Sequence, residues 1–76
     1  MNNERRKRLE ELRVKIEAIQ SIVEEIREEE QDYMDNMPEN LQGSERYEKA
    51  ECAVDELYSA YESLETAADS ITEAME

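Results

Sequence analysis

The chain of 76 residues contains no histidine, no tryptophan and no phenylalanine, and it has one cysteine, one glycine and one proline. Without histidine it lacks the commonest general base, the commonest zinc ligand and the side chain that titrates near neutral pH. Cys52 has no second thiol with which to form a disulfide within the chain. We therefore expect no enzymatic activity and no catalytic residues.

Long apolar runs are also missing. No run approaches the roughly 18 residues that a membrane-spanning helix needs, and no apolar segment of the kind found in a secretory signal follows the basic residues near the N-terminus. A lone thiol without a targeting segment is typical of a reducing compartment. These features predict a cytoplasmic protein that does not bind a membrane.

Negative charge dominates the composition. Charged residues make up 41% of the chain, and the formal net charge is −13. Residues 1–15 hold six basic and three acidic side chains, a balance of +3, so the remainder carries −16. An acidic surface repels nucleic acid and anionic lipid, so we expect no direct nucleic-acid binding through the acidic body. The charge favours a basic partner protein, or serves only to keep the chain soluble.

Two segments repeat apolar residues with heptad spacing, which is typical of helices that pack as a coiled coil. Leu9 is taken as position a of the first segment and Tyr47 as position a of the second. In the first segment only Glu30 interrupts the apolar a and d positions. The a and d residues are Leu9, Leu12, Ile16, Ile19, Val23, Ile26, Glu30, Tyr33 and Met37, then Tyr47, Ala50, Val54, Leu57, Tyr61, Leu64, Ala68, Ile71 and Met75.

The stretch DNMPENLQGSERYE, residues 35–48, separates the two segments. Pro38 disfavours the helical conformation at the residue before it, so the first helix should stop near Asn36. Gly43 frees the backbone, and Ser44 is a suitable N-cap for the second helix. Asn2 or Asn3 can cap the first helix. The sequence predicts helices over about 3–36 and 45–75 with a turn at about 37–44, as a single helical-hairpin domain over 1–76.

A hairpin that turns near residue 40 pairs positions whose numbers sum to roughly 80. This register matches a with d from Tyr33 beside Tyr47 to Leu9 beside Ile71, as an antiparallel coiled coil requires. Glu30 falls opposite Ala50 and can bend toward Arg46 or Lys49. The basic run Arg5–Arg8 falls beside carboxylates of the second helix, and we favour this explanation over the alternative of a basic patch that binds nucleic acid. Those carboxylates are Asp69, Glu73 and Glu76.

Further apolar residues outside a and d indicate a second packing surface. Alanine recurs every seven residues at position g of the second helix, and other apolar residues occupy e or g positions. We expect these residues to form an interface that joins two hairpins into a homodimeric four-helix bundle. The alternatives are a surface kept for a foreign partner and alanine used only as a helix former. The predicted interface is Ile22, Met34, Ala53, Tyr58, Ala60, Ala67 and Ala74.

Metal and thiol chemistry are not indicated. The acidic run EEIREEEQDYMD spreads its carboxylates around a helix and lacks the spacing of a calcium loop. A di-iron bundle needs Glu-x-x-His pairs, and there is no histidine. Cys52 falls at the outermost position, f, with no base beside it. We expect no metal and no cofactor. A turn does not by itself require the polar set Glu39, Asn40, Gln42 and Arg46, which we mark as a possible binding spot.

At Asp35–Glu48 the chain resembles a family of small uncharacterised acidic proteins from phages and prophages of Gram-positive bacteria. In that family a D-N-x-P-E-N-L-Q-x-S-E-R-Y-E turn joins a helix to a helix rich in Ala, Leu, Ile and Glu. The flanking helices match in character, so the resemblance covers most of the chain. It implies a bacterial cytoplasm during phage infection or lysogeny, and it brings no established activity or functional residue.

These observations favour a non-enzymatic protein–protein interaction module, of the kind that inhibits a host-defence or nucleic-acid-binding protein by presenting negative charge in the place of DNA. One alternative is an oligomer that sequesters an anionic nucleotide between copies of Arg5–Arg8. Another is a structural or assembly component of a phage.

Overall fold

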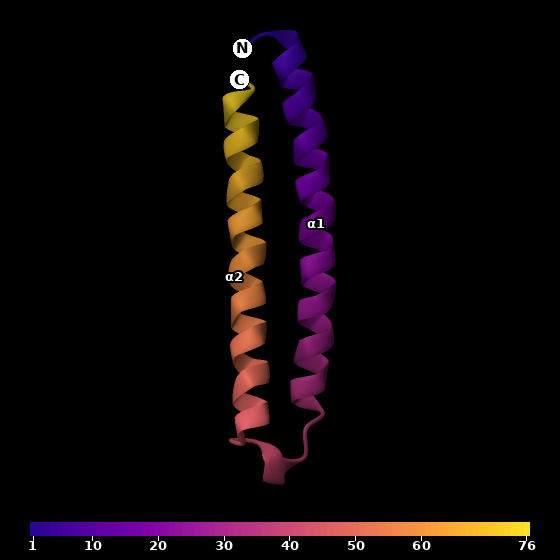
Figure 1. Ribbon diagram of the computed structural model, residues 1–76, viewed down its shortest axis with the longest axis vertical. Helices are drawn as coiled ribbons and strands as arrows, with labels where there is room; N and C mark the ends of the chain where they lie inside the picture. The colour runs from indigo at the N-terminus through magenta and orange to yellow at the C-terminus, as the bar shows by residue number, and fades with distance from the viewer.

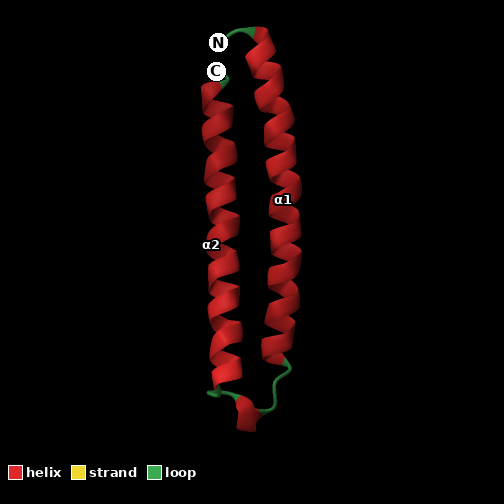
Figure 2. Ribbon diagram, viewed as in Figure 1, coloured by secondary structure: helices red, strands yellow, loops and turns green.

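The computed structural model describes residues 1–76 as a helical hairpin (Figure 1). Helix α1 (Asn3–Asp35) and helix α2 (Glu45–Ala74) run antiparallel and side by side, and a short 3₁₀ helix, η1 (Glu39–Leu41), lies in the turn. There are no strands (Figure 2). The molecule measures 59 × 14 × 12 Å. The predicted all-α hairpin is confirmed, and both helix ends lie within one residue of the predicted bounds.

Neither helix contains a stretch that is long and apolar enough to cross a bilayer.

The helix ends follow from the residues that the sequence places there. The side chain of Asn2 accepts a hydrogen bond from the Arg5 backbone at 2.8 Å, and the Ser44 hydroxyl accepts one from the Tyr47 backbone at 3.3 Å. Each satisfies one backbone N–H that has no partner inside the helix. Gly43 has a φ of 89°, which a residue with a side chain rarely adopts. Capping and turn residues thus fix where the chain reverses.

Two hydrogen bonds between the helices report their register. The guanidinium of Arg6 donates to the Met75 carbonyl at 3.0 Å, and the amide of Gln20 donates to the Tyr61 carbonyl at 3.4 Å. In both pairs the residue numbers sum to 81, close to the predicted 80. The chain termini consequently lie together at one end of the hairpin (Figure 1).

Little of the molecule is enclosed, because two helices can cover only one side of each other. The tightest cluster sits at the turn end, where Met34, Met37 and Ala50 are packed against the partly buried Leu41 and Tyr47. Five of the 76 residues are buried. They are Met34, Met37, Ala50, Val54 and Ala68.

The rotation of α1 differs from the predicted a/d seam. Its a and e positions face α2, and its d positions lie at the side, about half exposed. Two of the e positions hold long polar side chains that donate hydrogen bonds to α2, Arg6 and Gln20. In α2 the a and d positions face the partner helix as predicted. The half-buried or buried e residues of α1 are Arg6, Arg13, Gln20, Arg27 and Met34.

Candidate interaction surfaces

An apolar stripe runs along one flank of α1 and is covered by nothing in the hairpin. Its side chains are between 46% and 55% exposed, and they occupy the d and g positions that the rotation of α1 turns away from α2. Large apolar residues in one continuous line on a surface are typical of a contact with another molecule. The stripe consists of Leu12, Ile19, Ile22, Ile26 and Tyr33.

The alanines of α2 border this stripe. In an antiparallel helix pair the g positions of the two helices lie on the same flank. The register therefore places exposed Ala60 beside Ile22, and Ala67 and Ala74 follow toward the C-terminus, while Ala53 is half buried. The predicted grouping of Ile22 with the alanines agrees with this placement.

Two residues of the predicted interface lie elsewhere. Met34 is wrong as an open interface residue, because it is only 9% exposed and packs against Met37 and Ala50 in the core. Its e position faces α2 once α1 is rotated. Tyr58 is exposed, but it occupies an e position and so lies on the flank opposite the stripe. The predicted set therefore divides between two flanks and the core.

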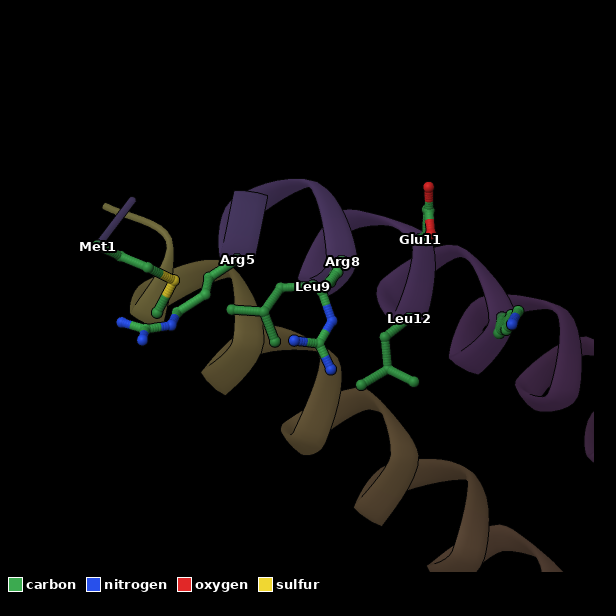
Figure 3. A pocket seen from close by; sticks show the side chains of 7 residues that line it. Met1, Arg5, Arg8, Leu9, Glu11 and Leu12 are labelled. Atoms are coloured by element: carbon green, nitrogen blue, oxygen red, sulfur yellow. The ribbon is translucent and has the colours of Figure 1, made fainter. Parts of the chain in front are cut away.

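A hollow of about 530 Å³ lies at the N-terminal end of the stripe (Figure 3). The side chains of Arg5, Arg8, Leu9 and Leu12 extend along the same flank, whereas Glu11 points away from them. Three of the lining side chains are basic. The lining residues are Met1, Arg5, Arg8, Leu9, Glu11, Leu12 and Lys15.

The basic run does not form the predicted ion pairs with the end of α2. No salt bridge joins it to Asp69, Glu73 or Glu76. Arg6 alone reaches across, and its partner is the Met75 carbonyl. Free carbonyls at a helix C-terminus attract cations, so the backbone serves here in place of a carboxylate. The charges of Arg5 and Arg8 are left facing the hollow.

A smaller hollow, about 380 Å³, lies at the turn end of the same flank. Glu30 lines it together with Arg46 and Lys49, but it forms a salt bridge with neither, and Lys49 pairs with Glu45 at 3.2 Å. Of the predicted turn spot only Arg46 lines this hollow. Glu39, Asn40 and Gln42 are exposed and line neither hollow.

An acidic ridge follows the outer edge of α2, on the flank opposite the stripe. No basic residue follows Lys49, and no ridge carboxylate takes part in a salt bridge. Exposed Tyr58 lies in the middle of the ridge. Acidic residues recur every seven residues at its b positions, a spacing that is visible in the sequence. From the sequence we predicted only an excess of negative charge and did not predict that it forms a ridge. The ridge consists of Glu48, Glu51, Asp55, Glu62, Glu65, Asp69 and Glu76.

On α1, by contrast, arginines neutralise carboxylates along the helix. Arg13 pairs with Glu10 and, at 2.7 Å, with Glu17, and Arg27 pairs with Glu24 at 2.6 Å. Hydrogen bonding to these guanidiniums lowers the pKa of Glu10 and of Glu24 from their ordinary values, and the positive charge adds to the effect.

Cys52 is a free, exposed thiol at position f of α2. No group of three or more His, Cys, Asp or Glu side chains is arranged to hold a metal ion. No protein-family model, curated protein or solved structure matches the chain.

Proposed function

We propose that the protein is a non-enzymatic interaction module that presents the acidic ridge of α2 to a basic surface on another protein. The observation that carries this proposal is the line of carboxylates without salt bridges between Glu48 and Glu76, which no basic residue interrupts. At a rise of 1.5 Å per residue, the seven carboxylates follow one another over about 40 Å. Neighbouring charges are therefore about 7 Å apart on average.

A nucleic-acid strand carries a comparable line of charge, with one phosphate about every 3.4 Å along the axis of a duplex. A basic groove that follows a phosphate backbone is therefore matched in sign by the ridge, whose charges lie about twice as far apart as the phosphates of one strand. Tyr58, in the middle of the ridge, supplies the aromatic contact that often anchors a protein interface. The resemblance to phage and prophage proteins is consistent with a partner in a bacterial cytoplasm, and we propose that this partner is a host-defence or nucleic-acid-binding protein.

Affinity capture with matched variants tests the proposal. The bait is the whole chain, incubated with a nuclease-treated lysate of a Gram-positive bacterium. The ridge variant carries E51Q, D55N, E62Q and E65Q. The control variant removes four exposed charges from α1 through E11Q, E25Q, E28Q and D32N, so that both have the same net charge.

The expected result is a protein that the unmodified chain and the α1 control retain, that the ridge variant loses, and that added duplex DNA displaces. Capture of no specific protein would contradict the proposal. So would a partner that the ridge variant retains as well as the control does, because net charge and not the ridge would then be responsible.

The basic hollow favours a second candidate function, the sequestering of an anionic nucleotide. Arg5, Arg8 and Lys15 supply three positive charges around about 530 Å³ of open space. Titration calorimetry with cyclic nucleotides checks this candidate, and the absence of binding heat for the unmodified chain would remove it.

A further inference from the structure

We infer that the apolar stripe of α1 is covered by a second copy of the chain. The two copies lie antiparallel, so that their α1 helices cross at a two-fold axis between residues 19 and 22. This inference does not depend on the acidic ridge, which lies on the opposite flank of the hairpin. It competes with the second candidate function, because the second copy and a nucleotide would occupy the same hollow.

The surface area of a single hairpin is the first argument for a second copy. The chain exposes 5742 Å², whereas a compact monomer of 9.0 kDa is expected to expose about 4,900 Å². The excess is about 850 Å². A standard protein interface buries about 800 Å² on each partner. A dimer interface of standard size along the stripe would therefore bury, on each copy, about as much surface as the hairpin exposes in excess of a compact protein.

The charges along the flank provide the second argument, because they make it complementary to itself. On α1 the N-terminal end of the stripe is bordered by Arg5, Arg8 and Lys15, and the turn end by Glu29 and Tyr33. In the smaller hollow beside the turn end, the positive charges of Arg46 and Lys49 are balanced by the negative charges of Glu30 and Glu45. A two-fold axis across the middle of α1 brings the basic end of each copy against the acidic and aromatic end of the other. A parallel arrangement would place the arginines of both copies together. The charges therefore select the antiparallel pair.

The spacing of the stripe defines a register for this pair. Its d and g positions alternate by three and four residues, as the core positions of a coiled coil do. If the ends of the flank meet, opposing residue numbers sum to 41. Ile19 of one copy then lies opposite Ile22 of the other, on both sides of the axis. Tyr33 lies opposite Arg8, where a cation over the face of an aromatic ring is favourable.

The hollow at the N-terminal end receives this tyrosine. Leu9, Leu12 and the basic side chains of Arg5 and Arg8 contribute to its lining (Figure 3). Along the same flank, exposed Ala60 and Ala67 have no bulk to keep the second copy away. The product is a four-helix bundle with α1 helices at its centre and both acidic ridges facing outward.

Charge reversal with rescue tests the arrangement. Lys15 and Glu29 are 14 residues apart on α1 and do not pair within one chain. In the antiparallel dimer, Lys15 of each copy lies within one helical turn of Glu29 of the other copy. K15E and E29K should each weaken the dimer about tenfold, because two symmetric attractions become repulsions. The double variant K15E/E29K should restore the affinity of the unmodified chain.

Sedimentation equilibrium at about 0.15 M NaCl measures the assembly, and circular dichroism verifies the helix content of each variant. The unmodified chain should have twice the 9.0 kDa mass of one copy. K7E makes the same charge change at an exposed f position of α1 and should leave the dimer intact. A monomer at all concentrations overturns the inference. A dimer that K15E/E29K does not restore also overturns it, since a parallel pair or another face would be responsible.

Discussion

Helices α1 and α2 carry the same heptad spacing, but they turn different parts of it toward each other. In α2 every a and d residue is buried or half buried, whereas in α1 every d residue is exposed. The difference follows from the residues beside the seam. In α1 the e positions hold Arg6 and Gln20, whose hydrogen bonds to carbonyls of α2 draw that side of the helix inward. The residues at the e positions of α1, and not its apolar a and d residues alone, therefore determine which side of α1 is covered by α2.

The two helices also differ in the distribution of their charges. α1 carries both signs and pairs several of its carboxylates with Arg13 and Arg27, while α2 has no basic residue after Lys49. One helix thus offers an apolar stripe between charges of both signs, and the other offers an unneutralised ridge. Two helices of similar length and period provide two surfaces that suit different partners.

A charge placed in the buried side of α2 should have the largest effect on this arrangement. Ala50 is 2% exposed and lies against Met34 and Met37. The short side chain of Ala50→Asp cannot reach water, so its carboxylate is buried without a partner. We expect a loss of about 3 kcal/mol in the free energy of unfolding. Urea denaturation followed by circular dichroism measures it.

The control is the same residue at an exposed position of the same helix. Ser59→Asp adds an equal charge at the outer face and should change the free energy of unfolding by less than about 0.5 kcal/mol. Equal losses for the two variants would mean that added charge, and not burial at position 50, is what destabilises the fold.

The sequence was sufficient to predict the hairpin, because its turn depends on local chemistry. Pro38, Gly43 and the cap Ser44 act within a few residues of themselves, so their effects can be read without a structure. The register followed from the same turn and from the matching of two apolar repeats. The hydrogen bonds of Arg6 and Gln20 bear it out within one residue.

The rotation of α1 could not be predicted from the heptad alone. A small rotation of α1 about its axis replaces the d positions by the e positions at the contact with α2. The apolar a residues are covered by α2 in either orientation. The outcome depends on whether long side chains at e reach carbonyls of the other helix, as Arg6 does at Met75. Met34 was placed at the interface for this reason, since its e position was taken to face outward.

Removal of the helix caps should have a smaller effect and should distinguish the two helix starts. Ser44 lies half buried beside the turn, whereas Asn2 lies at the exposed end of the chain. Ser44→Ala should cost about 1 kcal/mol in urea denaturation, a typical value for a lost N-cap. Asn2→Ala should cost less, because the first turn of α1 can fray without opening the hairpin.

Ser59→Ala is the matched control for the serine-to-alanine change. It lies in the interior of α2, where alanine is the better helix former, and should leave stability unchanged or slightly higher. An equal loss from Asn2→Ala and Ser44→Ala would show that both helix starts are equally coupled to the packing between the helices.

The smallest expected effect concerns pH, and it has opposite signs in the two helices. Arg27 holds the pKa of Glu24 below its usual range, chiefly through a side-chain hydrogen bond. A carboxyl whose pKa is lowered by folding stabilises the fold above its unfolded pKa, and this contribution disappears as pH falls through the folded pKa. Glu24→Gln should therefore lower the melting temperature at about pH 7 and leave it unchanged at about pH 2.

On α2 the corresponding change removes a charge that has no cation beside it. Glu62→Gln lowers the negative charge of a chain with a net charge of −13, so at about pH 7 the melting temperature should stay the same or rise. Thermal unfolding of both variants, at both pH values and low salt, measures the contrast. If Glu24→Gln and Glu62→Gln shift the melting temperature in the same direction at neutral pH, the arginine of α1 does not stabilise its helix. The electrostatic difference between the helices would then have no consequence for folding.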